Sequence, residues 1–389
     1  MEEASQISLM IHLSNLEDPR AGQNCKHNFF EAIFIAICAV ISGCECWTEI
    51  EDYAHAKKDW LKTFLVLKGG IPSHDTFRRI FCILDFASFQ KVFINWAQEI
   101  KKDLGVKKDQ ICIDGKTLRG SFNNSKLVKA LHMVNAWSTA TSMSLGQMPT
   151  EEKSNEITAI PRLLDLLDVR GSLVSIDAMG CQTEIAEKIV EKNGNYLLAV
   201  KENQKGLYEA TEELFRRSST RAQHGLPKSE YTENEKGSHG RDESRSCRVL
   251  YLEKEVDFFP QSDWPDIYSL IRVQSERVMR STGEVSTEVR YYISDAKKSA
   301  KEFNEKVRSH WQVENKLHWS LDVAMNEDSD KKWAEESAKN FPLLRQMALN
   351  LLKKESTKKS IRRKQKMAAM DNGYLLKVLF AGAASRSYA

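Results

Sequence analysis

The sequence predicts an α/β fold with a strand-rich insertion, preceded by an all-helical N-terminal domain. Residues 1–105 carry apolar side chains at helical spacing. From about Lys107, short β-prone runs alternate with helical patterns, which is typical of a sheet covered by helices. Further β-prone runs follow a polar, glycine-containing stretch that begins at Ser218. These changes of character divide the chain into residues 1–105, 106–217, 218–296, 297–352 and 353–389.

The N-terminal region is predicted to contain several helices and a candidate DNA-binding element. The sequence Gly-Gly-Ile-Pro at residues 69–72 interrupts the helical pattern, and Ser73 is a suitable N-cap for the helix that follows. Arg78 and Arg79 lie near the start of this helix, where they are candidate DNA contacts. The alternative is a surface helix with two solvated arginines. The predicted helices are residues 27–42, 47–58, 60–67 and 75–96.

The rest of the chain is predicted to supply a sheet, its covering helices and the insertion. The expected strands of the core are residues 111–113, 133–137, 173–176 and 196–200, with helices at 157–167 and 184–191. Strands of the insertion are expected at residues 247–252, 267–273 and 289–293. Helix is expected again from about Ala300 through Glu314, and from Trp333 to Lys353.

Three acidic residues are placed where a metal-dependent site for phosphoryl transfer requires them. Asp114 and Asp177 each end a β-prone run, which puts both charges at the carboxyl edge of the sheet. Glu314 lies much later, in a helical stretch. Carboxylate oxygens are the ligands that Mg²⁺ prefers, and two such ions can activate a nucleophile and stabilise a leaving oxygen. The arrangement indicates phosphodiester chemistry on nucleic acid.

Bulk properties restrict the class of protein further. The formal net charge is only +3, so a nucleic-acid surface must arise from local clusters of Lys and Arg. The N-terminus lacks the features of a signal peptide, and the longest apolar stretch is too short to span a membrane, so we expect a cytoplasmic protein. A zinc site among Cys25, His27, Cys38, Cys44 and Cys46 fits no standard spacing, and buried thiols are the favoured interpretation.

Several long motifs resemble the insertion-sequence DDE transposases, in particular the subgroup that includes the H-repeat-associated proteins. The resemblance covers nearly the whole chain. It rests on IDGKTLRGS (113–121), KSNEITAIPRLLDLL (153–167), GSLVSIDAMGCQTEIAEKIV (171–190), YLLAVKENQKGLY (196–208), HGRDESR (239–245), HWQVENKLHWSLDVAMNED (310–328) and NFPLLRQMALNLLKKE (340–355). The N-terminal run from Leu13 to Leu84 is similar to that subgroup's N-terminal region as well.

The resemblance implies an RNase H-like catalytic core whose β-rich insertion precedes the helix that carries the glutamate. Asp114, Asp177 and Glu314 fall on the three acids of the triad. Asp114 is then expected to bridge two Mg²⁺ ions, with Mn²⁺ as a possible substitute, and the other two acids to hold one ion each. The implied reaction is metal-dependent cleavage at transposon ends, followed by attack of the freed 3′-hydroxyl on target DNA. The implied partners are double-stranded DNA and a second copy of the chain, and on DNA the protein is expected at the bacterial nucleoid.

The surroundings of Glu314 depart from a signature common among related transposases. A Tyr, an Arg and a Lys often frame the glutamate, but these positions hold Val307, His310 and Leu321 here. His310 lies one helical turn before Glu314, where it is a candidate contact to phosphate. A metal site of His310, Glu314 and His318 is an alternative, although Mg²⁺ prefers oxygen to imidazole.

Further candidate DNA contacts follow from position or from the resemblance. They are Lys116, Arg119, Lys201, Asn203, Gln204, Arg241 and Arg245. Trp311 and Trp319 are candidates to stack on bases, but core packing is the favoured interpretation of their helical spacing. The basic run from Lys353 to Lys366 is either a phosphate-binding segment or a solvated helix end.

Two other functions remain open from the sequence. One is a Mg²⁺-dependent nuclease of the same fold that does not transfer strands. The other is a catalytically decayed remnant that only binds DNA.

Overall fold

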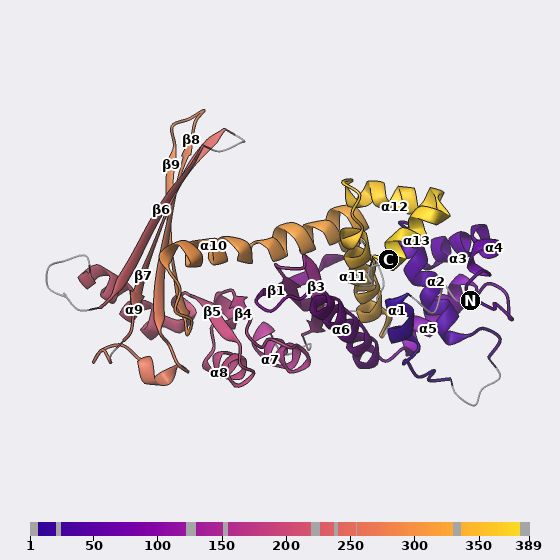
Figure 1. The fold of residues 1–389 in the computed structure, drawn as a ribbon, viewed down its shortest axis with the longest axis horizontal. Coiled ribbons are helices and arrows are strands. Elements are labelled where there is room, and N and C mark those ends of the chain that lie inside the picture. Colours follow the sequence, from indigo (N-terminus) through magenta and orange to yellow (C-terminus); the bar gives the residue numbers. More distant parts are fainter. Residues whose placement is uncertain are drawn as a thin grey trace. The chain divides into compact units, whose positions relative to one another are not determined.

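The computed structural model describes residues 7–20, 25–121, 130–150, 155–218, 226–236, 240–253, 255–329 and 336–381. Its contacts divide the chain into two units, each built from segments that are distant in sequence (Figure 1). Unit 1 comprises Met1–Val106, Gly115–Lys153 and Glu314–Ala389. Unit 2 comprises Lys107–Asp114 and Ser154–Val313. The fold is mixed α/β, because strands and helices occur in both units.

Unit 1 is mainly helical. Its helices are α1 (Ser8–Leu13), α2 (Phe29–Ile41), α3 (Trp47–Ala56), α4 (Lys58–Leu61), α5 (His74–Ile83), α6 (Phe86–Asp103), α11 (Ser337–Lys354), α12 (Ile361–Met370) and α13 (Asn372–Phe380). The antiparallel hairpin of β2 (Leu131–Ser138) and β3 (Met143–Pro149) completes it. The α11 helix packs against α2, α5, α6 and β3 and is buried along most of its length, so it forms the centre of this unit.

The N-terminal helices are found where the sequence predicts helix, with two corrections. The helix predicted at 75–96 is two helices, because Leu84 is extended and the Asp85 side chain accepts a hydrogen bond from Ser88 N–H to start α6. The helix predicted at 60–67 is the short α4, which ends at Leu61. The Ser73 cap is confirmed, since its hydroxyl accepts a hydrogen bond from Thr76 N–H.

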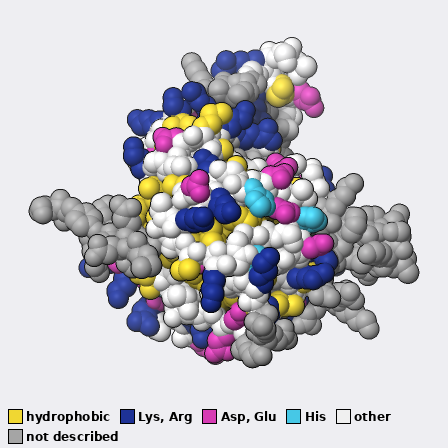
Figure 2. Space-filling model, turned by 90° about the vertical axis from the view of Figure 1, so that its right-hand side faces the viewer, with side chains coloured by type: hydrophobic (Ala, Val, Ile, Leu, Met, Phe, Trp, Pro, Cys, Tyr) yellow, Lys and Arg dark blue, Asp and Glu magenta, His cyan; other side chains and the backbone are white. Residues whose placement is uncertain are grey.

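A separate N-terminal helical domain is not confirmed. The contacts group α1 to α6 with the β2–β3 hairpin and with α11 to α13 in one unit. Figure 2 shows the side of the molecule that lies on the right in Figure 1. On this side, Lys and Arg side chains, in dark blue, are scattered among acidic and apolar ones. Within the described ranges, no single helix is long and apolar enough to cross a membrane. Only the bent pair of α5 and α6, taken together, reaches that length and composition.

Unit 2 contains a mixed sheet with helices packed on it. Its strands are β1 (Gln110–Leu118, which belongs to this unit through Asp114), β4 (Leu173–Ile176), β5 (Asn195–Val200), β6 (Lys228–Lys236), β7 (Arg241–Tyr251), β8 (Ser269–Met279) and β9 (Val285–Ser294). Its helices are α7 (Glu156–Leu166), α8 (Thr183–Glu191), α9 (Lys205–Ser218) and α10 (Ala300–His310). The strand order is β1-β4-β5-β9-β8-β7-β6.

The direction of the strands separates the core of this sheet from the insertion. Strands β1, β4 and β5 are parallel, whereas β9, β8, β7 and β6 join in antiparallel order as four long strands (Figure 1). The α10 helix packs on β6, β7 and β8. Phe303 and Val307 of α10 meet Cys247, Val249 and Ile271 of the strands in a buried core. The strands predicted for the core and the insertion are confirmed, and β3 and β6 are two that the sequence analysis missed.

Candidate active site

Asp177 lies directly after β4, as predicted. Its backbone is extended, and its side chain accepts a hydrogen bond from Met179 N–H at 3.2 Å. This bond fixes the carboxylate at the start of the short 3₁₀ turn Ala178–Gly180. The side chain is neither fully buried nor fully exposed, so one side of it is open to a ligand.

Asp114 occupies the matching position on the neighbouring strand. The parallel register pairs Ile113 with Ile176, so Asp114 and Asp177 take the next position on their two strands. Residues at matching positions of adjacent strands point to the same face, and adjacent strands lie about 4.8 Å apart. The two carboxylates are therefore neighbours. One detail of the prediction is wrong: β1 runs on to Leu118, so Asp114 ends the pairing with β4 and not the strand.

The surroundings of Asp177 disfavour its charged form. Burial raises the pKa of this carboxyl group above its ordinary value, and the nearby charge of Glu156 adds to the effect. Hydrogen bonds from Gly180 and Met179 and the positive charge of Lys201 act in the opposite direction but do not cancel it. A bound cation relieves such a penalty, and carboxylate oxygens are suitable ligands for a hard divalent ion. The two aspartates therefore fit a divalent metal.

No larger metal cluster is visible in the part of the chain that the structure describes. There, no group of three or more His, Cys, Asp or Glu side chains is arranged to hold a metal ion. Glu314, the third predicted acid, is the first residue of the last segment of unit 1, whereas both aspartates belong to unit 2. The structure therefore describes the neighbours of Glu314 that belong to unit 1.

Residues after β5 support the turn that follows Asp177. Asn203 donates a hydrogen bond to the carbonyl of Ala178 at 2.7 Å, and Gln204 donates one to the carbonyl of Cys181 at 2.8 Å. The sequence analysis named these two residues as candidate DNA contacts. Their amide nitrogens instead hold the loop that begins at Asp177, so we assign them a positioning role.

A pocket of about 510 Å³ opens beside Asp177 within unit 2. Its walls come from the ends of β4 and β5, from α9 and from β9. Charged, polar and aromatic side chains line it, among them Asp177, Lys201, Asn203, Tyr208, Glu288 and Arg290. The sequence analysis missed Tyr208 and Arg290. Tyr208 lies within the quoted motif that contains Lys201, which was a usable signal, whereas nothing local marked Arg290.

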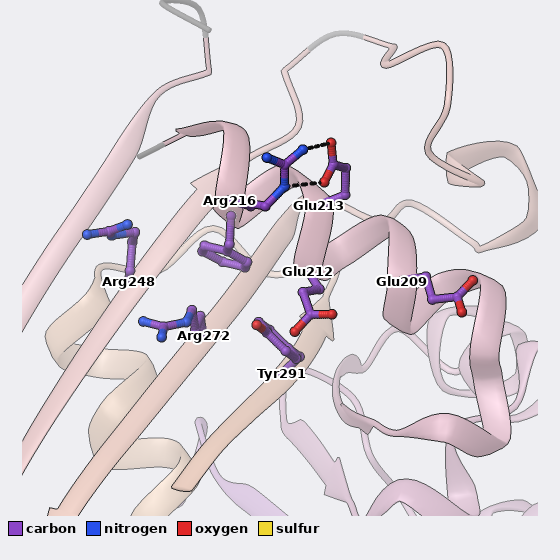
Figure 3. Close-up of a pocket in the computed structure, with 8 residues that line it drawn as sticks. Glu209, Glu212, Glu213, Arg216, Arg248, Arg272 and Tyr291 are labelled. Carbon is purple, nitrogen blue, oxygen red and sulfur yellow. Dashed lines mark hydrogen bonds and ion pairs between the residues drawn. The ribbon is translucent and has the colours of Figure 1, made fainter. Parts of the chain in front are cut away.

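A second pocket of about 590 Å³ lies between α9 and the strands of the insertion (Figure 3). Arg248 and Arg272 come from directly paired positions of β7 and β8, while Glu209 and Glu212 come from α9. Arg216 is held by both carboxylate oxygens of Glu213 at 2.6 Å. Positive and negative side chains thus share this pocket, which therefore has no strong preference for an anion.

Glu314 lies on a π-helical segment, Val313–His318, that follows α10. Such wide turns are rare and occur often at functional sites. Its side chain is exposed, while Leu317 on the same segment is buried. The Tyr and the Lys of the common signature are replaced here by Val307 and Leu321. Each of these two side chains is only 1% exposed. Both act as apolar core residues and cannot contact DNA from these positions.

Lys116 has a different environment from the one predicted. Its side chain is only 8% exposed, and its ammonium group forms ion pairs with the carboxylates of Asp322 and Glu327 in unit 1. These carboxylates outweigh burial and raise the pKa of Lys116. A cation enclosed in this way is not available to a phosphate, so the geometry does not favour the predicted DNA contact.

The two histidines near Glu314 are also engaged inside the protein. His310 Nδ1 lies 3.0 Å from the hydroxyl of Ser175 on β4, and burial lowers the pKa of this imidazole to about 4. His318 is 7% exposed and lies 3.5 Å from the amide nitrogen of Asn135. Burial and the charge of Lys116 lower the pKa of His318 to about 3. Both rings are neutral at pH 7, so neither carries a charge for a phosphate. The alternative metal site is not favoured because the two rings are buried against different partners, Ser175 and Asn135.

Trp311 and Trp319 correct another expectation, because both are exposed. Trp319 is 60% exposed and Trp311 is 39% exposed, with the Arg290 guanidinium 4.7 Å from the centre of the Trp311 ring. The favoured interpretation, core packing, is therefore wrong. Stacking of these rings on bases stays a prediction.

The remaining candidate DNA contacts are distributed over both units. Arg78 and Arg79 are exposed on α5, and Arg78 lies 3.5 Å from Asp75. Arg119 is 84% exposed and lies 3.8 Å from Asp328. Arg241 is exposed at the start of β7, whereas burial lowers the pKa of Arg245, whose Nε is buried without an acceptor among the described residues.

A family model described as "Transposase DDE domain" matches residues 106–351, and one described as "DDE_Tnp_1-associated" matches residues 10–97. The chain therefore belongs to the DDE transposase family. Proteins of this family bind DNA and generally use a divalent metal ion, so membership supports a transposase function.

The chain is similar to proteins of Escherichia coli over almost its full length. It is 42% identical to the "H repeat-associated putative transposase YhhI" of strain K12 over 95% of this chain and 97% of the relative. It is also 42% identical to the "Putative protein YbfL" of the same strain, with the same coverage. Identity to the "Putative transposase YncI" of strain O157:H7 is 40%, over 96% of this chain and 94% of the relative. The resemblance stated from the motifs is thereby confirmed.

Proposed function

We propose that this protein is a DNA transposase that cleaves DNA at the ends of its element and joins the freed 3′-hydroxyl to target DNA. The observation that carries the proposal is the pair of aspartates at matching positions of β1 and β4. We infer an RNase H-like core, which the family implies and which agrees with the parallel order β1-β4-β5.

In the proposed site, Asp114, Asp177 and Glu314 hold Mg²⁺, and Mn²⁺ can replace it. The metal, when bound, supplies positive charge at the reacting phosphate and at the nucleophile. The carboxylates fix its place at the sheet edge, and Asn203 and Gln204 hold the loop after Asp177 by their hydrogen bonds. Lys201, at the end of β5, adds a positive charge beside Asp177 for a DNA phosphate.

The chemistry consists of two substitutions at phosphorus. In the first, a water oxygen bonds to phosphorus while the bond to the 3′-oxygen breaks, which leaves a 3′-hydroxyl and a 5′-phosphate. In the second, this 3′-hydroxyl attacks a phosphodiester of the target, and the target's own 3′-oxygen leaves. Each step exchanges one phosphorus–oxygen bond for another, so positioning and electrostatic stabilisation supply most of the catalysis.

The test is cleavage of a plasmid that carries this gene with its native flanks. We compare the wild type with Asp177→Ala and Asp114→Asn, with Mg²⁺, Mn²⁺ or a chelator. Asp165→Asn is the matched control, because Asp165 is an exposed carboxylate on α7. We expect metal-dependent cuts at the flanks for the wild type and the control, and none for the two site variants. Equal cutting by Asp177→Ala would refute the assigned site.

Two alternatives differ in the outcome of further assays. Pre-cut ends supplied to the protein give joined products if it transfers strands, and none if it is a nuclease alone. A decayed, DNA-binding remnant has one specific observation in its favour, since the polar residues of the common signature are replaced by the buried Val307 and Leu321. It predicts DNA binding without cleavage under any metal condition.

We further propose that residues 73–84 contribute to recognition of the element ends and that two copies of the chain hold two ends together. Arg78 and Arg79 are exposed on α5, as a DNA contact requires. Replacing both with Ala is expected to weaken binding to end DNA more than binding to unrelated DNA. The mass of the complex with end DNA, measured by light scattering, decides whether two copies are present.

A further inference from the structure

The segment after α11 lies outside both family matches and folds into the helices α12 and α13. Its basic run was open to two interpretations from the sequence, a phosphate-binding segment or a solvated helix end. The structure separates one cation of the run from the others, because Lys364 is buried and the rest are not.

Lys364 anchors α12 to the body of unit 1. Its side chain is 4% exposed and donates hydrogen bonds to the carbonyls of Leu352 and Glu355. It also lies 3.2 Å from the Glu355 carboxylate, which accepts a further hydrogen bond from the Tyr374 hydroxyl at 2.6 Å. The buried ion pair therefore fixes which side of α12 faces the protein and which faces solvent.

Three other cations of the run lie on the outer side of α12. The basic face, as we call it, consists of Arg362, Arg363 and Lys366 of α12, all exposed. Their spacing of three and four residues places them next to one another on the helix surface. No carboxylate forms an ion pair with any of them among the described residues, and α12 has no acidic residue in its first turn.

Several exposed arginines elsewhere in the chain have acidic partners, unlike the cations of the basic face. Arg216 pairs with Glu213, Arg280 with Asp242 and Arg308 with Glu235. On α12, by contrast, like charges at helical spacing repel one another, and two of them lie in the first turn, where the helix dipole also opposes a cation. A bound polyanion removes both unfavourable terms.

We propose that the basic face of α12 binds the phosphate backbone of DNA independently of base sequence, as a second contact besides the site at Asp177. The proposal rests on the proposed function only in naming DNA as the polyanion. Lysine and arginine charges on one helix face neutralise phosphates and release counterions, which makes the affinity depend on salt concentration. The face is rigid because Lys364 and Glu355 hold the helix in place.

The test uses the full chain carrying Arg362→Gln, Arg363→Gln and Lys366→Gln together. The matched control is Lys62→Gln, Lys68→Gln and Lys91→Gln, which removes the same charge from exposed positions elsewhere in unit 1. Affinity for a duplex of random sequence is measured by fluorescence anisotropy between 50 and 200 mM salt, with a chelator to prevent cleavage. A third variant, Arg362→Lys with Arg363→Lys, keeps the charge.

If each of the three cations meets one phosphate, the slope of log K against log salt falls by about 2.7, from about 0.9 for each phosphate. Over this fourfold range of salt, the difference corresponds to a factor of about 40 in relative affinity. We expect the control to change the slope by less than about 1 and the Lys variant to retain the wild-type slope. The Gln variant is expected to have a thermal midpoint no lower than that of the wild type, because it removes repulsion and no contact to protein.

A slope for the Gln variant equal to that of the control would overturn the proposal. The proposal would also be overturned if the Gln variant lost binding to polyglutamate or to anionic vesicles while its DNA binding stayed as in the wild type. The polyanion that the basic face binds would then not be DNA. Failure of the proposed function is a separate result: it appears as equal cleavage by the wild type and Asp177→Ala, and it leaves the slope measurement unaffected.

Discussion

Replacing Lys116 with Met tests whether this residue is a buried structural cation and not a DNA contact. The substitution keeps most of the apolar stem and removes the charge. Lys116 is 8% exposed and Glu327 is 2% exposed, so the variant leaves the Glu327 carboxylate buried without its ion-pair partner, with Arg345 as the remaining nearby positive charge. Breaking one side of a buried pair costs about 3–5 kcal/mol. We expect a loss of unfolding free energy of about that size.

The assay is urea unfolding of the full chain, in which a lower midpoint at unchanged slope reports lost stability. The double variant Lys116→Met with Glu327→Gln is expected to recover much of the loss, because the buried charge at position 327 is removed as well and Asp322, the other partner of Lys116, is 32% exposed to solvent. Arg119→Met is the matched control, since its pair with Asp328 is 3.8 Å long and Arg119 is 84% exposed, and it is expected to change stability by less than about 1 kcal/mol.

Two results would refute the reasoning. One is a Lys116→Met protein as stable as the Arg119→Met control, which would show that the buried ion pairs contribute nothing. The other is a Lys116→Met protein of normal stability whose DNA affinity has become less sensitive to salt, which would restore the phosphate contact expected from the sequence.

Three further predictions concern Asp177, His318 and the two amide side chains that hold the loop after Asp177. The pKa of Asp177 is raised in the folded protein, so the free energy of unfolding falls as pH rises from the unfolded to the folded pKa of this group. Asp177→Asn should therefore be more stable than the wild type at pH 7 in urea titrations, and its stability should depend less on pH. Burial lowers the pKa of His318 from its ordinary value of 6.5 to about 3, so below pH 6.5 the unfolded chain binds this proton first. His318 should therefore contribute a fall in stability of about 1.4 kcal/mol per pH unit from there toward pH 4, in addition to the contribution of His310. His318→Gln should flatten that slope. Asn203→Ala and Gln204→Ala should slow cleavage at saturating DNA while leaving DNA affinity unchanged, because each hydrogen bond holds the loop after Asp177.

The sequence was sufficient where local pattern decides the structure. The strands that lead to Asp114 and Asp177 are short apolar runs, and their parallel pairing follows from the alternation of strands and helices. Ser73 was recognisable as a cap because a hydroxyl side chain before a helical pattern satisfies a free N–H group at the helix start. These features depend on a few neighbouring residues.

Elements whose stability comes from partners elsewhere were missed. The β6 strand is polar except for Tyr231, and pairing along its whole length with β7 holds it in the sheet. The β3 strand contains Gly146 and Pro149, which weaken a strand pattern, but its Ser144 and Gln147 join a buried network with Gln346 of α11. No window of the sequence contains both halves of such a contact.

Charged residues show the same limit most clearly. Lys116 and Lys364 look like surface cations in sequence, one after a predicted active-site residue and one inside a basic run. Whether a lysine is buried depends on a carboxylate that meets it in the fold, here Glu327 and Glu355. Both pairs turn a residue expected to bind phosphate into one that holds the protein together.

These buried pairs make the remaining uncompensated charges informative. Where the protein buries Lys116 or Lys364, it supplies a carboxylate. Asp177 is a carboxyl group whose pKa is raised despite a neighbouring lysine, and the basic face of α12 is a set of cations without acidic partners. The first environment favours a metal cation and the second a polyanion. A protein that uses a divalent ion to act on DNA requires both, and the two sites are independent enough that substitution at either one tests it alone.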